Sequence, residues 1–257
     1  MTQPQELFAG RWTRIAIRNR DSITELRLHR DGGPLVWDFA VHHELTEALG
    51  AIEEHTSTKV LILTGTGDSF CNSIDVQSFQ EAVTDWEQIW QEGREMLRRL
   101  VDLSMPVISV INGPARIHAE IGVLADVVLG ADDLILADHA HFTRGTPPGD
   151  GVHVIWPALL GPTYGRYFLM TGAELGARQA LDRGVIHELH PREDLSGRAW
   201  ALAEGMAKLP RSTLRYSRAA LSLSLRRHFA QDLSHGLALQ GLAYYARGAK
   251  IKHDGER

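Results

Sequence analysis

The sequence contains one cysteine, Cys71, in 257 residues, so no disulfide can form within the chain. So little cysteine is typical of a reducing compartment, and we expect a cytoplasmic location. No stretch approaches the ~20 consecutive apolar residues that a membrane-spanning helix needs. The first residues, MTQPQELFAGRWTR, lack the apolar run of a signal peptide. We therefore expect no membrane partner.

The chain also lacks an excess of positive charge, because 27 Lys and Arg residues stand against 32 Asp and Glu residues, a net charge of −5. A nucleic-acid-binding domain usually presents a basic face, so we expect no nucleic-acid partner. The 13 histidines are scattered along the chain, and neither an HExxH nor a paired CxxC pattern is present. The sequence therefore predicts no metal site and no cofactor.

What the sequence does contain is an alternation of strand-like and helix-like segments. Residues 13–30 predict a β-hairpin, with apolar arms at 15–17 and 23–28. Short apolar runs at 59–67, 105–113, 123–131 and 132–138 are typical of buried strands, and helical spacing marks 45–52 and 85–103. The alternation predicts an α/β fold. From about Pro162 the pattern is mostly helical, with segments at 169–181, 195–209 and 210–246.

Two histidines and two aspartates lie in one loop, DHAHFTRGTPPGDG, at residues 138–151. Asp150 sits between two glycines, where it either caps a helix beginning near His153 or orients His141 as a buried carboxylate. For the pair His141–Asp150, a structural hydrogen bond and a catalytic role are equal alternatives. Asp138 and His139 are interpreted as solvated surface groups.

Two further loops follow predicted strands. The glycine-rich stretch TGTGDSFCNSIDV (64–76) matches neither phosphate-binding pattern, so we interpret it as a tight exit from a strand. The loop INGPARIHAEIG (111–122) contains His118, which is either a surface residue or, if it converges with other polar groups, part of a site.

Together these segments resemble the crotonase (enoyl-CoA hydratase/isomerase) superfamily. The resemblance covers most of the chain and rests on KVLILTGTGDSFCNSIDV, PVISVINGPA, LADVVLGADD, PPGDG, LMTG and ARQALDRGVIHEL. It implies a spiral of ββα turns, with a crotonase-like α/β core over residues 1–194. It also implies a C-terminal helical region over residues 195–257 that helps to form a homotrimer or a dimer of trimers.

The departures from the family pattern concern the residues that carry chemistry. His118 stands where a glycine normally donates an oxyanion-hole N–H. Ile121, with Glu120 adjacent, stands where hydratases carry their first catalytic Glu, and His141 stands where they carry the second. The substitutions are similar to those of the 6-oxocamphor-hydrolase type of β-diketone hydrolases, which cut a carbon–carbon bond between two carbonyls without CoA. One departure from that group is Gln240, which aligns with a Glu and cannot act as a base.

This resemblance implies retro-Claisen hydrolysis of a cyclic or bicyclic 1,3-diketone to a keto acid, with protonation of the enolate. We expect His141 to act as the base, Asp150 to hold its tautomer and stabilise the imidazolium, and His118 to donate to the enolate oxygen. The alternatives are a CoA-thioester hydratase or isomerase and a catalytically silent crotonase-fold oligomer. The substrate pocket is expected to contain Trp37, His42, Ile74, Phe79, Trp90 and Gln240.

Overall fold

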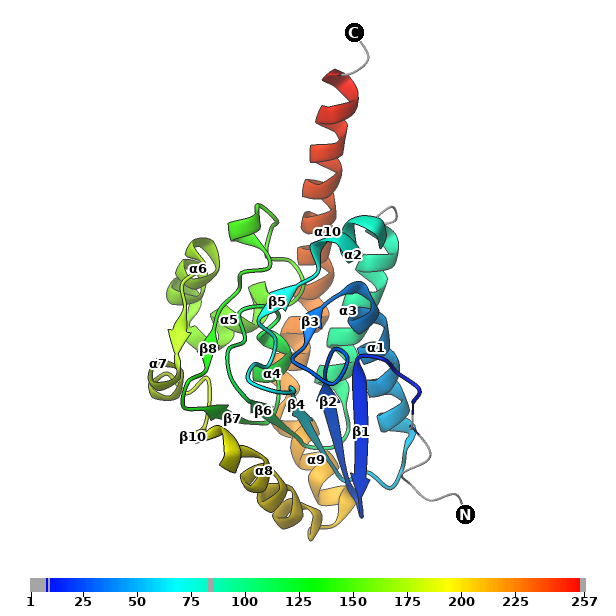
Figure 1. Ribbon diagram of the computed structural model, residues 1–257, viewed down its shortest axis with the longest axis vertical. Coiled ribbons are helices and arrows are strands. Elements are labelled where there is room, and N and C mark those ends of the chain that lie inside the picture. The colour runs from blue at the N-terminus through cyan, green and yellow to red at the C-terminus, as the bar shows by residue number, and fades with distance from the viewer. Residues whose placement is uncertain (1–7, 9, 83–85, 255–257) are drawn as a thin grey trace.

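The computed structural model of the chain describes residues 8, 10–82 and 86–254 (Figure 1). Residues 1–7, which belong to the segment without the apolar run of a signal peptide, lie outside the described residues. Asp85, at the start of the predicted helix 85–103, does so as well. Within the described ranges, every helix is too short or too polar to cross a membrane.

A six-stranded sheet forms the centre of the molecule, in the order β1-β2-β4-β6-β7-β10. β1 and β2 form the predicted antiparallel hairpin, with Ile15 opposite Leu28, and the other neighbours pair in parallel. All residues of β4 and β6 are buried, as their continuous apolar sequences predict. The strands are β1 (Ile15–Arg20), β2 (Ile23–Leu28), β4 (Val60–Thr64), β6 (Val107–Ile111), β7 (Val127–Ala131) and β10 (Glu188–His190).

Two small sheets connect the loops beyond the ends of these strands. β3 (Val36–Trp37) pairs in parallel with β5 (Ser73–Ile74), which places Trp37 opposite Ile74. β8 (Ile135–Leu136) pairs with β9 (Leu175–Gly176) in antiparallel fashion. Loop segments that are far apart in the sequence are thereby held side by side.

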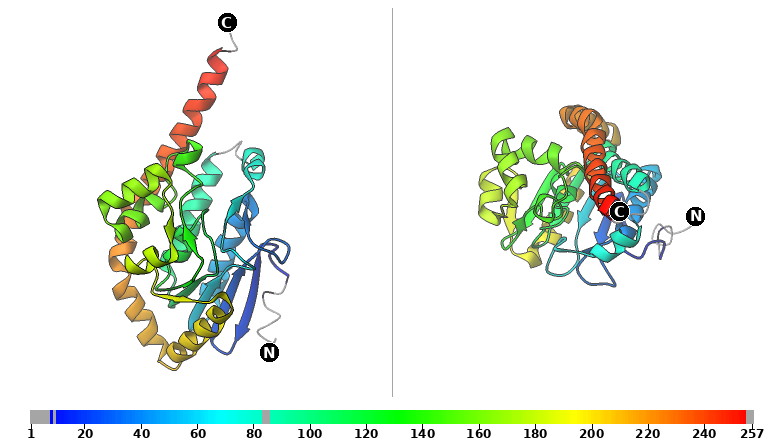
Figure 2. Two further views of the ribbon diagram at one scale, coloured as in Figure 1. Left: turned by 60° about the vertical axis from the view of Figure 1, so that its left-hand side comes forward. Right: turned by 90° about the horizontal axis from the view of Figure 1, so that it is seen from above.

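Helices surround the sheet, and α10 extends beyond the rest of the molecule (Figures 1 and 2). α1 begins at Asp38, whose carboxylate accepts a hydrogen bond from the Val41 amide at 3.0 Å. The helices are α1 (Phe39–Glu54), α2 (Val76–Ala82), α3 (Trp86–Asp102), α4 (Glu120–Val123), α5 (Val152–Leu160), α6 (Pro162–Thr171), α7 (Ala177–Asp182), α8 (Arg192–Ala207), α9 (Arg211–Leu221) and α10 (Leu223–Asp254), with a 3₁₀ turn η1 (Phe142–Arg144).

The mostly helical segment predicted at 169–181 is helical at its two ends, in α6 and α7, and is interrupted between them by strand β9. Gly172 adopts a left-handed conformation with φ 64° directly after α6, and this conformation ends a helix. The apolar residues on both sides of the glycine keep a helical spacing, so the interruption is hidden in the pattern.

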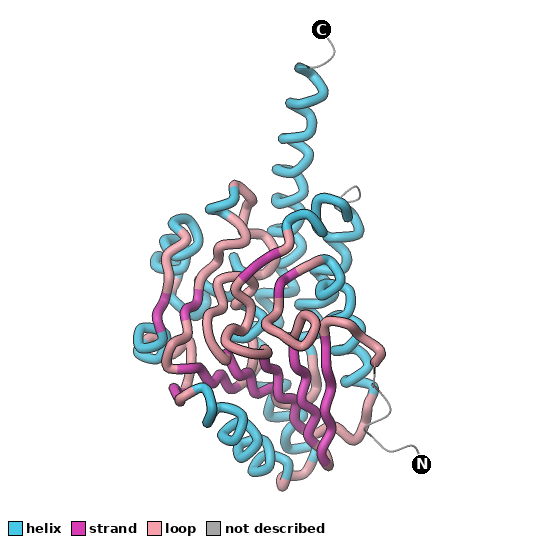
Figure 3. The backbone as a smooth tube through the Cα atoms, in the orientation of Figure 1, coloured by secondary structure: helices cyan, strands magenta, loops and turns pink. Residues whose placement is uncertain are grey.

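The hydrophobic core lies on both faces of the sheet, with the strands gathered at the centre (Figure 3). On one face, Ile62, Ile108 and Leu129 pack against Leu195 and Ala199 of α8. The other, larger cluster joins the sheet to α1, α3, α5 and α10. The division of the chain at residue 194 stays a prediction.

Candidate active site

A cavity of about 340 Å³ lies among the small sheet of β3 and β5, helices α2, α3 and α10, and the loops that precede α4 and α5. Small-molecule sites typically occupy about 300–1,000 Å³, so its size suits a compact organic ligand. Most of its wall is apolar, and a few polar groups converge at one end. Its lining residues are Trp37, His42, Ile74, Val76, Phe79, Trp86, Ile89, His118, Ala140, His141, Thr146, Asp150, Leu237, Gln240 and Tyr244.

Asp150 is placed in this cavity by the two glycines that flank it. A Cβ atom on Gly149 would lie 2.3 Å from the carbonyl oxygen of Gly236 in α10, so only glycine permits this close approach. Gly151 has φ 93°, a conformation that favours glycine, and it is the N-cap residue of α5 without a side-chain cap. The interpretation of Asp150 as a helix cap is therefore wrong, because its carboxylate faces His141 instead.

His141 is in contact with a carboxylate at each ring nitrogen. Nδ1 lies 2.7 Å from Oδ1 of Asp138, and Nε2 lies 2.9 Å from Oδ2 of Asp150. Burial acts to lower the pKa of His141, but the negative charges of Asp150 and Asp138 outweigh it and hold this pKa well above its ordinary value. Burial likewise acts to raise the pKa of Asp150, and the charge of His141 outweighs it and lowers that pKa. The geometry thus favours an imidazolium between two carboxylates.

This arrangement corrects the expected role of Asp150. The carboxylate that holds Nδ1 of His141 belongs to Asp138, which is buried with 2% of its surface exposed rather than solvated as predicted. The loop after β8 folds inward, so a residue with the composition of a surface group becomes part of the interior. Asp150 instead meets Nε2, and its second oxygen, Oδ1, is buried without a hydrogen-bond partner in the described part of the chain.

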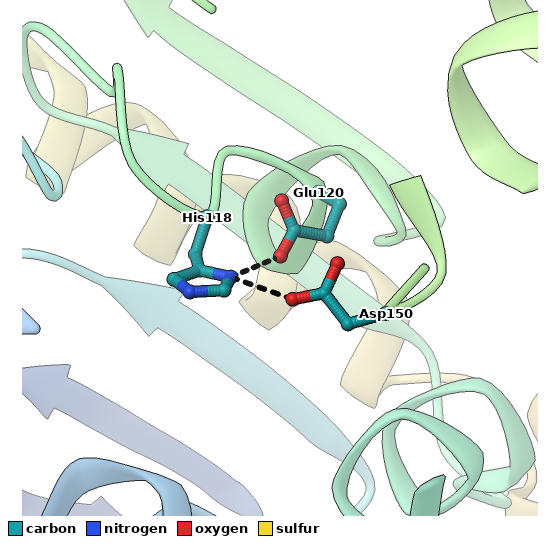
Figure 4. Close-up of side chains that lie close together, drawn as sticks. All are labelled: His118, Glu120 and Asp150. Carbon is teal, nitrogen blue, oxygen red and sulfur yellow. Dashed lines mark hydrogen bonds and ion pairs between the residues drawn. The ribbon is translucent and has the colours of Figure 1, made fainter. Parts of the chain in front are cut away.

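His118 adopts a left-handed backbone conformation, with φ 49°. This conformation costs a non-glycine residue roughly 1–2 kcal/mol, which explains why glycine suits the matching position of the wider family. Nδ1 of His118 lies 2.6 Å from Oε1 of Glu120, the first residue of α4, and 3.6 Å from Oδ2 of Asp150. Figure 4 shows the other ring nitrogen turned away from both carboxylates, so this nitrogen remains for a ligand.

Glu120 is a functional candidate that the sequence leaves unassigned, although it is adjacent to the family's carboxylate position. Burial raises the pKa of Glu120 above its ordinary value, against the opposing charge of His118. Burial acts to lower the pKa of His118, but the charge and hydrogen bond of Glu120 outweigh it and raise this pKa. The two side chains therefore form a buried, hydrogen-bonded pair.

His118, Glu120 and Asp150 also offer three ligand atoms within 4.8 Å of one another, close enough to consider a metal ion. Ligands in a tetrahedral zinc site stand about 2.0–2.2 Å from the metal, which places them more than about 3 Å apart. The 2.6 Å separation between Nδ1 of His118 and Oε1 of Glu120 is that of a hydrogen bond. The donor set in this arrangement fits a hydrogen-bonded network better than an ion site.

Five of the six residues predicted for the pocket wall line the cavity, namely Trp37, His42, Ile74, Phe79 and Gln240. The indole of Trp37 lies 4.1 Å from the ring of His118, between ring centroids, and its Nε1 is buried without a hydrogen-bond partner among the described residues. The sixth, Trp90, is not a lining residue. Its Nε1 lies 3.4 Å from the carbonyl oxygen of Ser234, and its position in α3, one residue after Ile89, turns it away from the cavity.

Comparisons with known proteins agree with this architecture. The chain belongs to the enoyl-CoA hydratase/isomerase family, whose model matches residues 19–249. Enoyl-CoA delta isomerase 2 from Rattus norvegicus is 25% identical over 210 residues, which is 79% of this chain and 53% of that protein. The chain thus spans about half the length of this relative. Carnitinyl-CoA dehydratase from Proteus mirabilis is 29% identical over 199 residues, 75% of this chain and 74% of the relative.

Among solved structures, a β-diketone hydrolase from the cyanobacterium Anabaena sp. PCC 7120, bound to (S)-3-oxocyclohexyl acetic acid, has a TM-score of 0.90 and 36% sequence identity. The similarity covers 95% of this chain and 98% of that chain. An enoyl-CoA hydratase/isomerase from Mycobacterium paratuberculosis has a TM-score of 0.84 at 22% identity, a likeness in fold alone. The predicted crotonase fold is confirmed, and the chain is a member of the crotonase superfamily.

Proposed function

We propose that the protein is a β-diketone hydrolase, which cleaves a cyclic or bicyclic 1,3-diketone at a carbon–carbon bond and releases a keto acid. The observation that carries the proposal is the convergence of His118 and the His141–Asp150 pair in one mostly apolar cavity. The 36% identity to the Anabaena β-diketone hydrolase supports it.

The cleavage produces an enolate, whose oxygen needs hydrogen-bond donors. The ring nitrogen of His118 that faces away from Glu120 is one donor. Nε1 of Trp37 is a second, because it is buried without a partner in the described structure and its ring lies against His118. A donor of this kind contributes about 10²–10³ in kcat when it is preorganised in a site that excludes water.

The other end of the reaction is the addition of water to a carbonyl carbon. Oδ1 of Asp150 is the open acceptor of the His141–Asp150 pair, so water donates its hydrogen bond there and gives its proton to this carboxylate. Because both ring nitrogens of His141 face carboxylates, Asp150 takes the role of base that the sequence predicts for His141. The water oxygen bonds to the carbonyl carbon. Collapse of the tetrahedral intermediate then breaks the carbon–carbon bond, whose electron pair passes to the enolate. Asp138 fixes the ring of His141 throughout.

A CoA-thioester hydratase or isomerase is the second candidate function. It is favoured by the buried carboxylate of Glu120 beside the site and by the curated relatives, whose names describe isomerases and dehydratases of CoA thioesters. The side chain of His118 argues against it, because it stands where the wider family places a glycine.

Parallel incubations distinguish the two. We expect acid release from a bicyclic 1,3-diketone, detected by mass spectrometry, and no change in 2-enoyl- or 3-enoyl-CoA thioesters. Conversion of a thioester together with inert diketones contradicts the proposal.

We also propose that the protein is a homotrimer or a dimer of trimers. α10 presents apolar residues to solvent, including Leu242 with 66% and Tyr245 with 58% of their surfaces exposed. Such side chains on a projecting helix are suited to burial against further copies of the chain. Light scattering at about micromolar concentration is expected to give three or six times the monomer mass, and a monomer refutes the proposal.

A further inference from the structure

The proposed reaction leaves one proton unassigned, the proton that the enolate carbon must receive. Three histidines line the cavity, and two of them are engaged elsewhere. His118 stands beside Trp37 at the proposed oxygen-binding end, and His141 is in contact with a carboxylate at both ring nitrogens. The third, His42, has a buried Nδ1 with no hydrogen-bond partner among the described residues.

His42 is fixed in the cavity wall by aromatic rings and by α3. Its ring stands edge-on to Trp37, with centroids 6.2 Å apart, and edge-on to Phe79 at 6.5 Å. A Cβ atom on Gly93 would lie 3.2 Å from Cε1 of His42, so the glycine lets the backbone of α3 close against the ring. The same Cβ atom would lie 3.4 Å from Nε2 of His42, so the ring is held in the cavity wall beside α3.

Behind His42 lies the carboxylate of Glu92, whose side chain is 17% exposed. Oε2 of Glu92 is 3.7 Å from Nδ1 of His42, and it too is buried without a hydrogen-bond partner in the described ranges. Burial acts to raise the pKa of Glu92, but its interactions with His42 and Gln88 and the charge of His43 outweigh burial and lower this pKa. Glu92 therefore places a carboxylate beside Nδ1 of His42, where it stabilises a positive charge on the ring.

Glu92 also connects the cavity wall to the surface. Its Oε1 accepts a hydrogen bond from Nε2 of Gln88 at 2.9 Å and lies 3.6 Å from Nδ1 of His43. The side chain of His43 is 59% exposed. The order from the inside outward is thus His42, Glu92, His43 and solvent. A side-chain movement of less than about 1 Å brings each pair within hydrogen-bond distance.

We propose that His42, as an imidazolium paired with Glu92, protonates the enolate carbon, and that Glu92 and His43 return a proton to it from solvent. This inference rests on the proposed diketone hydrolysis. An N–H bond of His42 breaks and its electron pair stays on nitrogen. The enolate's carbon–carbon π pair forms the new C–H bond, and the C=O of the ketone is restored. After cleavage, the His141–Asp150 pair releases to solvent the proton that it took from water, and the new carboxylic acid ionises. Because His42 takes one proton back from solvent, one proton is released per turnover.

Deuterium labelling tests the assignment. The substrate is bicyclo[2.2.2]octane-2,6-dione, whose hydrolysis gives 3-oxocyclohexyl acetic acid. In D₂O, the former bridgehead carbon of the product gains one deuterium, and NMR at early times distinguishes its two positions on the ring. We expect the wild-type protein to place the deuterium on one face only.

His42→Phe keeps an aromatic ring but has no proton to give. We expect it to lower kcat by about 10²–10⁴, with KM changed only a few-fold, and to distribute deuterium over both faces. Glu92 acts through His42 as a positioning residue, so Glu92→Gln is expected to lower kcat rather than raise KM and to erode the same selectivity. Glu95→Gln, on the solvent side of α3, is the matched control and leaves both unchanged.

Thermal melting verifies that each variant is folded, and His42→Gln serves as the alternative if His42→Phe is not. If the folded His42 variant keeps a near-native kcat and still places deuterium on one face only, the assignment of His42 as the proton donor is wrong. Wild-type protein that releases no keto acid overturns the proposed function, and this inference with it.

Discussion

Replacement of Asp150 by asparagine tests the pair on which water activation depends. Oδ2 of Asp150 lies 2.9 Å from Nε2 of His141, and both side chains are shielded, with 13% and 4% of their surfaces exposed. Asparagine is nearly isosteric, and its amide donates to Nε2 of a neutral ring while Nδ1–H still faces Asp138. We expect Asp150→Asn to fold and to lower the pKa of His141 from its raised wild-type position, so that the ring is neutral at pH 7.

The expected loss of activity is large and the loss of stability moderate. A general-base contribution is worth about 10²–10⁴ in rate, or about 3–5 kcal/mol of transition-state stabilisation. Removal of one partner from a buried ion pair costs about 3–5 kcal/mol when the other charge remains. Because His141 can lose its proton, we expect the free energy of unfolding to fall by less than about 3 kcal/mol.

Three measurements examine these expectations for Asp150→Asn. Keto-acid release gives kcat, nitrogen–proton correlation spectra of the imidazole report the protonation of His141, and urea denaturation gives the free energy of unfolding. His141→Ala is expected to be as damaging, and the double variant little worse than either, because residues that act as one unit are not additive. A near-native kcat for Asp150→Asn refutes the catalytic pair, and an imidazolium that persists refutes the electrostatic argument.

Three further predictions follow from the site. His118→Asn retains a residue that tolerates the φ of 49°, so we expect a melting temperature within a few degrees of wild type and a kcat lowered about 10²–10³-fold; unchanged kcat excludes His118 as an oxyanion donor. The pKa of His141 is raised from its ordinary 6.5, so the stability it contributes is complete below pH 6.5 and is lost as pH rises through the raised pKa. The pKa of Asp150 is lowered from 3.8, so the stability that it contributes is present above pH 3.8 and is lost as pH falls through the lowered pKa. Urea denaturation at a series of pH values measures both effects. If the free energy of unfolding declines at alkaline pH in His141→Ala as it does in the wild type, this account is wrong. EDTA is expected to leave diketone cleavage unchanged; activity that EDTA abolishes and a divalent ion restores shows that a metal is required.

The elements of the sheet could be predicted because the burial of their residues follows from the pattern of apolar residues within each short segment. The hairpin alternates, and the strands VLILT and VISVI are continuously apolar. The side on which Trp90 faces could not be predicted in this way. α3 packs against both α1 and α10, so apolar residues occur on more than one side of the helix, and adjacent positions differ by about 100° in direction.

In the site, likewise, residues that belong to local motifs could be predicted, and residues whose burial depends on tertiary contacts could not. The resemblance to β-diketone hydrolases predicts His118, His141 and Asp150, and the structure brings these three together. Asp138 and Glu120 are absent from that prediction, since a carboxylate in a loop has the sequence character of a solvated group. Their burial follows from how the loops fold over the sheet, and that depends on residues distant in sequence.

Two of the polar atoms in the cavity wall that have no hydrogen-bond partner among the described residues, Nε1 of Trp37 and Oδ1 of Asp150, have a consequence for substrate choice: the first donates to a carbonyl oxygen, and the second accepts from water. A buried polar group without a partner costs about 1–3 kcal/mol, so a ligand that supplies matching groups removes this cost. An analogue with a methylene in place of one carbonyl fits the same apolar walls and leaves a donor unpaired. Sites of this kind reject such analogues far more strongly than they reject a change in ring size. Selectivity for a carbonyl oxygen is therefore set by the donor at the polar end of the cavity, and tolerance of different carbon skeletons is set by its walls.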